Sequence, residues 1–235
     1  MHMDLQANIA AIQNRIQAAC EKAGRDPLSV KLMAVSKGQP PQLVEKAAEC
    51  GLTLFGENKV QEAKAKIGMC SGKLHWHLIG HLQTNKCRDA VHFFEQIHSV
   101  DSLHLAEEID RHGQKAGKRI PILLEVNVAG EATKFGYKPE SLITDFLKIN
   151  DLSHIEIHGL MTIAPWSLEP ERVRPFFRKL RELKNECQQI LGAPLAELSM
   201  GMSGDFEVAI EEGSTLVRIG TAIFGARSTP QKSLG

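Results

Sequence analysis

The stretch KLMAVSKGQPPQLVEKAAECGLTLFGEN, residues 31–58, combines two short apolar runs with a longer segment between them whose apolar residues recur every three or four positions. Short apolar runs are typical of buried strands, and the longer spacing is typical of an amphipathic helix. The stretch therefore predicts a strand, a helix and a second strand, at 31–37, 41–50 and 52–57.

The same alternation continues along the rest of the chain. Strands are expected at 31–37, 52–57, 75–80, 96–101, 120–128, 155–163, 195–201 and 216–225. Helices are expected between them at about 41–50, 58–68, 82–92, 102–117, 139–149, 170–191 and 204–212, and one more at 4–23 precedes the first strand. Because no hairpin dipeptide such as Asn-Gly joins two strands, the connections indicate crossovers and parallel pairing.

This pattern predicts an α/β fold, a single (β/α)8 TIM barrel that spans residues 1–235 and carries an extra N-terminal helix. The length agrees, since such barrels typically need about 250 residues. An open doubly wound sheet is the alternative. It is disfavoured because no G-x-G-x-x-G follows the first strand, where a dinucleotide-binding sheet would have it.

Composition excludes several other classes of protein. Lysine plus arginine (28) balances aspartate plus glutamate (28), so no net positive field draws the chain to nucleic acid or to an anionic membrane. No apolar run approaches the roughly 18 residues of a membrane span, and the N-terminus lacks the apolar core of a signal peptide. We expect a cytoplasmic protein without nucleic-acid or membrane partners.

Its cysteines, which form no C-x-x-C pair, are expected to be small buried apolar residues: Cys20, Cys50, Cys70, Cys87 and Cys187.

In a barrel, chemistry gathers where the strands end at their carboxyl side. Lys37 ends the first predicted strand, and strand alternation places it on one face with Met33 and Val35. If that face is interior, Lys37 points into the barrel mouth, where partial burial favours the neutral amine that attacks carbonyl groups. The alternative is a lysine that extends to solvent from a strand end.

Two loops contain the small and hydroxylated residues of a phosphate site. One follows the seventh strand and contains Ser199, Met202 and Ser203, and the other contains Gly220 and Thr221. The loops after strands seven and eight are the usual phosphate site of a barrel, because small residues let backbone N–H groups approach an anion. Each loop taken alone is also consistent with an ordinary turn.

Arg218 interrupts an apolar strand, and a buried arginine needs an acceptor. That acceptor is either a ring nitrogen or phosphate of a ligand, or a structural carboxylate such as Glu57 or Glu125. Asn58, which follows the second strand, either reaches the mouth or caps the next helix.

Three histidines, His75, His77 and His81, suggest a metal site, because H-x-H on a strand places both rings on one face. No second group of ligand residues accompanies them at other strand ends. We therefore expect packed or hydrogen-bonded histidines and no metal.

Six motifs together resemble a known family: AVSK at 34–37, FGEN at 55–58, WHLIGHLQTNK at 76–86, HGLMTI at 158–163, LSMGMS at 198–203 and VRIGTAIFGAR at 217–227. Their order and spacing are similar to those of the pyridoxal phosphate homeostasis protein family. The resemblance covers nearly the whole chain. It implies a barrel like the N-terminal domain of alanine racemase, of fold type III among proteins that use pyridoxal 5'-phosphate (PLP).

The resemblance also implies roles for individual residues. Lys37 would hold PLP as a Schiff base, and Arg218 would face the ring nitrogen and keep it unprotonated, which weakens the electron sink of the cofactor. The phosphate would lie at Ser199, Gly220 and Thr221, with Met202 and Ser203 nearby. Asn58 is added to these as a cofactor-binding residue, and none of them is assigned a catalytic role.

The resulting prediction is a PLP-binding protein that masks, buffers or delivers the cofactor, with PLP-requiring apoenzymes as recipients and a monomeric or loosely dimeric state. One alternative is an amino-acid racemase. It is disfavoured because the chain has one tyrosine, Tyr137, and no room for the extra β domain of that class. A second alternative is a cofactor-free Schiff-base aldolase, which also fits a lysine and a phosphate site in a barrel.

Overall fold

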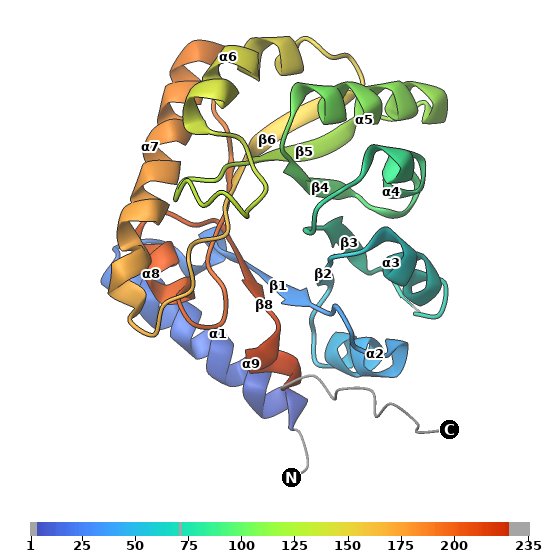
Figure 1. The fold of residues 1–235 in the computed structure, drawn as a ribbon. Coiled ribbons are helices and arrows are strands. Elements are labelled where there is room, and N and C mark those ends of the chain that lie inside the picture. Colours follow the sequence, from blue (N-terminus) through green and yellow to red (C-terminus); the bar gives the residue numbers. More distant parts are fainter. Residues whose placement is uncertain (1–3, 71, 226–235) are drawn as a thin grey trace.

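A computed structural model describes residues 4–70 and 72–225, and strands β1 to β8 form one closed parallel barrel in chain order (Figure 1). The predicted (β/α)8 fold is confirmed. The strands are β1 (Lys31–Val35), β2 (Leu54–Glu57), β3 (His75–Leu78), β4 (Gln96–Val100), β5 (Ile120–Glu125), β6 (Ile155–Met161), β7 (Glu197–Ser199) and β8 (Leu216–Ile219).

Helices surround the barrel and return the chain to the same end of the sheet each time (Figure 1). They are α1 (Leu5–Lys22), α2 (Pro41–Glu49), α3 (Val60–Ile67), α4 (Cys87–Phe93), α5 (Leu103–Ala116), α6 (Pro139–Asn150), α7 (Arg174–Leu191), α8 (Phe206–Glu211) and α9 (Thr221–Phe224). Short 3-10 turns lie at Pro27–Ser29, Thr84–Lys86 and Pro170–Val173.

The strands end earlier than the sequence predicts. β1 stops at Val35, so Lys37 lies in the turn after the strand and not at its end. The largest difference is in β8, predicted to reach Gly225. It ends at Ile219, because the carbonyl of Gly220 accepts hydrogen bonds from the N–H groups of Ile223 and Phe224 and the chain turns into α9. Apolar runs show that a segment is buried, but a short buried helix and the end of a strand have the same composition.

The predicted N-terminal helix is α1, which packs against α8 and α9 near the end of the described chain (Figure 1). Its apolar side is buried through Ile9, Ile12 and Ile16. The side-chain amide of Asn8 donates to the carbonyl of Ile223 at 2.9 Å. The helix therefore ties the two ends of the chain together beside β8.

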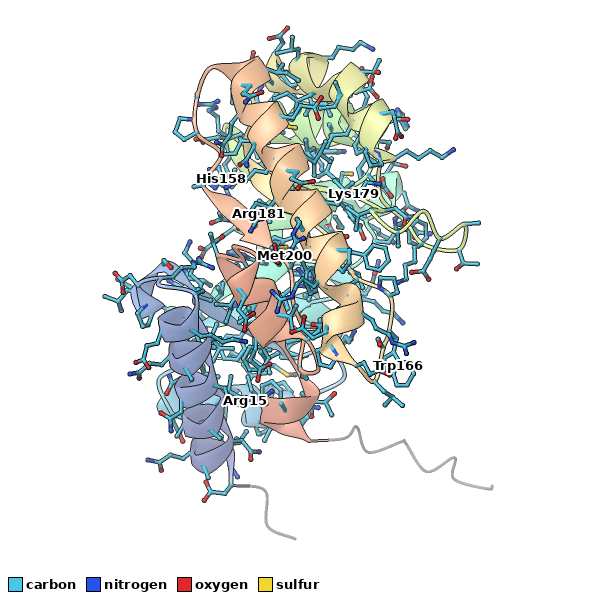
Figure 2. All side chains as sticks on the ribbon, turned by 90° about the vertical axis from the view of Figure 1, so that its left-hand side faces the viewer. Arg15, His158, Trp166, Lys179, Arg181 and Met200 are labelled. Atoms are coloured by element: carbon cyan, nitrogen blue, oxygen red, sulfur yellow. The ribbon has the colours of Figure 1, made fainter. Side chains whose placement is uncertain are left out.

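Helix α7 lies lengthwise along one side of the molecule (Figure 2). Arg174, Arg178 and Arg181 on this helix each form an ion pair with Glu212, at 3.0–3.2 Å, just after α8. Phe177 is fully buried. The helix is thus packed against the barrel, and its arginines connect it to α8.

The cysteines are free thiols. Cys20, Cys87 and Cys187 are buried as expected, whereas Cys50 and Cys70 are half-buried. Burial raises the pKa of the buried thiols, which makes them poor nucleophiles. No helix within the described residues has the length and apolar character needed to cross a membrane.

Gly159 in β6 is the position where the barrel is least tolerant of a side chain. A Cβ there would lie 1.9 Å from the carbonyl oxygen of Glu197 on β7. We expect Gly159→Ala to lower the free energy of unfolding by about 3 kcal/mol, because the two backbones must separate. Chemical denaturation followed by circular dichroism measures this. Gly68→Ala, whose Cβ meets nothing within 4 Å, is the control and should change the value by less than about 0.5 kcal/mol.

Candidate functional site

The interior face of β1 carries Met33 and Val35, which pack with Ile79 and Leu216 inside the barrel. The face that alternation groups with Lys37, left open by the sequence, is therefore the interior one. Lys37 follows two residues later in the turn and is half-buried at the mouth. Period-2 alternation therefore grouped Met33 and Val35 correctly, and the strand ends before Lys37.

β1 and β8 meet closely at the mouth. A Cβ on Gly220 would lie 3.3 Å from the carbonyl oxygen of Val35, tighter than most such contacts. The absence of a side chain at Gly220 lets the two strand ends approach. Thr221, exposed at the start of α9, is thereby brought to the same end of the barrel as the turn that contains Lys37.

The loop after β7 is folded onto itself by Asp205. The Asp205 carboxylate accepts a hydrogen bond from the N–H of Met202 at 2.6 Å, and the N–H of Asp205 donates to the carbonyl of Met202. Gly201 has φ +95°, and a Cβ there would lie 2.7 Å from the Cβ of Ala209. The backbone therefore follows a path that only glycine permits at this point.

The loops after β7 and β8 come together at Ser203. Its hydroxyl oxygen accepts a hydrogen bond from the N–H of Ala222 at 3.4 Å. Within residues 4–70 and 72–225, the N–H groups of Ser203, Gly204 and Thr221 donate no hydrogen bond. These N–H donors and the hydroxyl groups of Ser203 and Thr221 suit an anion such as a phosphate.

Arg218 lies in the interior of the barrel, and only 4% of it is exposed. Its guanidinium donates to the hydroxyl of Ser199 at 2.7 Å and to the carbonyl of Thr162 at 2.8 Å. No carboxylate in the described part of the chain forms an ion pair with it. Burial lowers the pKa of Arg218 to about 10, which leaves the group cationic at neutral pH.

The structure therefore excludes both carboxylates considered as ion-pair partners of Arg218. Glu57 points to the outer side of the sheet and pairs with Lys66. Glu125 interacts with Arg218 through its charge alone and forms no ion pair with it. Burial raises the pKa of Glu125 to about 7. This carboxyl lines a cavity of about 160 Å³ together with Lys134, Phe135 and Ile163.

A chain of hydrogen bonds supports Arg218 from below. Ser199 contacts His98 Nδ1 at 3.1 Å, His98 Nε2 contacts Gln96 Oε1 at 3.2 Å, and the Gln96 amide donates to Glu197 at 2.8 Å. At the floor of the barrel, Lys31 donates to the same carboxylate.

Arg218 sets the direction at the upper end of this chain. A guanidinium can only donate, so the hydroxyl oxygen of Ser199 accepts from it. Burial holds the pKa of His98 well below 6.5, so its ring is neutral and carries one N–H. The Nε2 atom of this ring lies 3.2 Å from Gln96 Oε1 and 3.0 Å from His77 Nδ1. Ser199 therefore connects Arg218 to a buried, neutral histidine.

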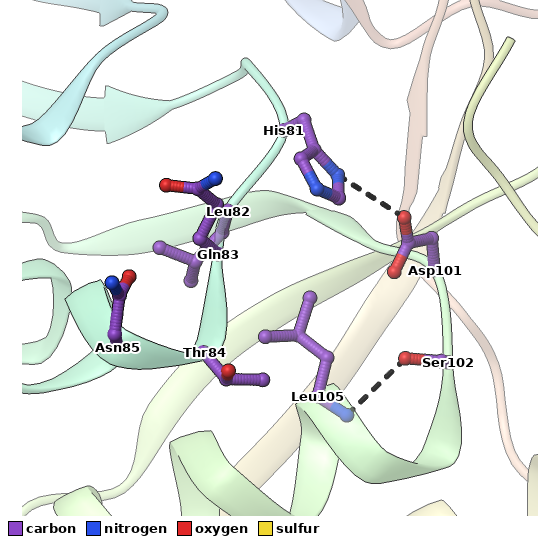
Figure 3. A pocket seen from close by; sticks show the side chains of 8 residues that line it. All are labelled: His81, Leu82, Gln83, Thr84, Asn85, Asp101, Ser102 and Leu105. Atoms are coloured by element: carbon purple, nitrogen blue, oxygen red, sulfur yellow. Dashed lines mark hydrogen bonds and ion pairs between the residues drawn. The ribbon is translucent and has the colours of Figure 1, made fainter.

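The three histidines considered as metal ligands lie in three different environments. His75 pairs with Glu95 on the surface at 2.7 Å. His77 contacts His98 at 3.0 Å in the interior, where burial lowers its pKa to about 4. His81 pairs with Asp101 at 3.3 Å beside a cavity of about 450 Å³ (Figure 3).

Asn58 does not cap α3, since the residue at the N-cap position is Lys59. The Asn58 side-chain oxygen is buried and has no hydrogen-bond partner among the described residues. A buried amide oxygen of this kind is available to a donor that is not part of the polypeptide.

Three parts of the chain thus lie at the mouth of the barrel: Lys37, the loop with Met202 and Ser203, and Gly220 with Thr221. Arg218 and Ser199 lie inside the barrel, as one hydrogen-bonded pair. Sequence reasoning missed Lys66, which is 4% exposed on α3. A signal was present, because Lys66 falls on the buried side of the helix three residues after Ala63 and six after Val60.

The chain is similar to known proteins over nearly its whole length. Residues 7–228 match the model of the alanine racemase N-terminal domain. Pyridoxal phosphate homeostasis proteins of Aquifex aeolicus and Pseudomonas aeruginosa are 46% and 42% identical to this chain, over 96% and 94% of its length and over 99% and 94% of their own.

Solved structures agree with the sequence comparison. PipY of Synechococcus elongatus with PLP bound is 37% identical, with a TM-score of 0.84, and covers 94% of this chain and 100% of its own. PipY without PLP gives a TM-score of 0.85 at 38% identity, with the same coverage of both chains. An alanine racemase of Clostridium difficile is 16% identical with a TM-score of 0.74 over 96% of this chain and 57% of its own, and it shows the shared fold alone.

The carboxyl of Glu125 should make stability depend on pH in a defined direction. In the folded protein Glu125 has a pKa of about 7, whereas an ordinary glutamate has a pKa near 4.5. Between these two pH values the folded chain binds more protons than the unfolded chain. The contribution of Glu125 to the free energy of unfolding therefore falls as pH rises through this range, by at most roughly 3 kcal/mol.

Glu125→Gln removes this titration. Relative to the wild-type protein, its free energy of unfolding should rise between pH 5 and pH 8 by up to roughly 3 kcal/mol, as measured by urea denaturation. Glu156→Gln, at an exposed position on β6, controls for the loss of a charge. An identical pH dependence in the wild type and Glu125→Gln would contradict the burial of an ionisable carboxyl at this point.

Proposed function

Since the chain belongs to the pyridoxal phosphate homeostasis protein family, we propose that it binds PLP at the mouth of the barrel and takes part in PLP homeostasis. The PLP-bound PipY, which has the same fold over nearly the whole chain, supports this proposal. In this proposal the protein holds the cofactor in a masked form and supplies it to enzymes that require it.

The observation that carries the proposal is the environment of Arg218. A buried cation normally pairs with a carboxylate, and this one donates to a hydroxyl and to a backbone carbonyl instead. An acceptor such as the ring nitrogen of PLP fits a guanidinium that Ser199 and Thr162 already orient. Arg218 would then bind the ring, and Ser199 would act through Arg218.

The other residues fit the remaining parts of the cofactor. Lys37, in the turn at the mouth, would supply the amine that attaches PLP. Ser203, with Met202 beside it, and Thr221, with Gly220 before it, would surround the phosphate with hydroxyl and backbone N–H donors. Asn58 would offer its buried amide to the cofactor.

Holding the cofactor is favoured over racemisation by two features of this chain. When bound, PLP supplies an aldehyde that condenses with amines and a ring that can accept electrons, and an arginine opposite the ring nitrogen weakens the second property. The one tyrosine, Tyr137, is 5% exposed, and burial raises the pKa of its hydroxyl. Tyr137 is therefore unsuited to act as the second base of a racemase.

The recipients of the cofactor, a monomeric or loosely dimeric state and a cytoplasmic location stay predictions from the sequence. A cofactor-free Schiff-base aldolase would use the same lysine and the same loops. It differs in one property that is easily measured, because an aldolase of that kind takes up no PLP.

Lys37→Ala tests the attachment point. The wild-type protein incubated with PLP should show a visible absorption band that disappears on borohydride reduction, with the pyridoxyl group on the peptide containing Lys37. Lys37→Ala should lose the band and keep its circular dichroism spectrum, because the side chain is half-buried at the mouth and contributes little to the core. Lys59→Ala, at a nearby exposed lysine, is the control and should behave as wild type.

Arg218→Gln tests the contact with the ring. Glutamine retains a donor for Ser199 and removes the positive charge, so we expect weaker PLP binding, by about tenfold, and a shifted absorption band. An unchanged spectrum and affinity, in a variant that is folded by circular dichroism, would contradict this contact.

A further inference from the structure

The peptide groups on both sides of Lys37 are held by side chains of α3. The ammonium group of Lys66 donates to the carbonyl of Ser36 at 2.7 Å, just before Lys37. The N–H of Gly38, just after Lys37, donates to the carboxylate of Glu62. The backbone is therefore fixed at two points, one residue on either side of the amine that the proposed function uses.

The two holding residues also fix each other. Glu62 and Lys66 are four residues apart on α3, so they lie on the same side of the helix, with 3.1 Å between Lys66 Nζ and Glu62 Oε1. The third hydrogen bond of Lys66, at 2.6 Å, goes to Glu57 on β2, which also accepts from the hydroxyl of Ser36. All three N–H bonds of the ammonium group are thus used, which sets its orientation.

This buried arrangement adds little to the free energy of unfolding. Lys66 is 4% exposed and Glu57 is fully buried, and removing such a pair from water costs several kcal/mol, which its attraction only partly returns. An apolar pair could connect α3 to β2 as well. Only polar side chains, however, can bind a peptide carbonyl and a peptide N–H in the same turn.

We propose that Glu62 and Lys66 are positioning residues that clamp the turn Ser36–Gly38 and thereby direct the side chain of Lys37 toward the cofactor. The inference rests on the proposed function. A lysine side chain has four rotatable bonds, so a mobile backbone beneath it would spread the amine over many positions. With the turn fixed, less freedom is lost when the amine reaches the cofactor.

Glu62 is the residue to change, because removal of Lys66 would leave Glu57 buried without a cation and would strongly destabilise the fold. The Glu62 side chain is 31% exposed, so its loss leaves the core intact. Glu62→Ala removes the contact with Gly38 and one of the three bonds of Lys66. Glu62→Gln keeps an oxygen for both donors and is the conservative variant.

Glu108→Ala is the matched control. Glu108 pairs with Arg111 within one turn of α5, is 24% exposed, and has no bond to the turn that carries Lys37. If Glu62 only stabilises a helix, the two alanine variants should have similar melting temperatures and identical PLP affinities.

PLP affinity is measured by absorbance titration of the full chain. We expect the apparent Kd of Glu62→Ala to rise about tenfold, that of Glu62→Gln to stay within about twofold of wild type, and that of Glu108→Ala to equal wild type. Equal affinity in wild type and Glu62→Ala would overturn the clamp.

A second readout needs no PLP. Acetylation of Lys37 by an amine-directed ester, followed by peptide mass spectrometry, should be several times faster in Glu62→Ala than in Glu108→Ala, since the half-buried amine gains freedom. If wild type binds no PLP at Lys37, the proposed function fails, and the acetylation rates still decide the clamp. If wild type binds PLP at Lys37 and Glu62→Ala matches the control in affinity or in acetylation rate, the clamp alone is wrong.

Discussion

The pairing of β1 with β8 is the contact on which the rest of the structure depends. It closes the sheet, so that none of the strands β1 to β8 has an exposed edge, and it joins residues far apart in the sequence, with Lys31 opposite Leu216. Because the strands are parallel, their carboxyl ends meet at one mouth. Gly220 then allows β8 to end against Val35, and the turn with Lys37 and the loop with Thr221 share one site.

Two sets of polar side chains, most of them buried, lie beside this mouth on different sides of the sheet. Inside the barrel, an ordered series of hydrogen bonds leads through His98 and Ser199 to Arg218. Outside, Lys66 and Glu62 hold the turn that carries Lys37. Burying both sets costs desolvation energy. In return, hydrogen bonds fix the orientation of the groups that they join, which apolar packing alone does not do.

The fold could be predicted from the sequence because helical and strand periodicity are local properties, and all eight strands lie where short apolar runs occur. The ends of the strands could not be predicted. Lys37 lies in a turn and Thr221 begins α9, and the geometry at both places depends on neighbouring strands. The partners of Arg218 could not be predicted either. Ser199 and Thr162 are 19 and 56 residues away in the sequence, and the register of the strands in the barrel brings them beside Arg218.

In the proposed function, one mouth binds PLP through an amine, an arginine and two loops at once. A crystal structure of the full chain after incubation with PLP tests this proposal most directly. We expect cofactor density joined to Lys37, with the ring nitrogen at Arg218 and the phosphate between Ser203 and Thr221. Density bound at another lysine, or a ring turned away from Arg218, would contradict it.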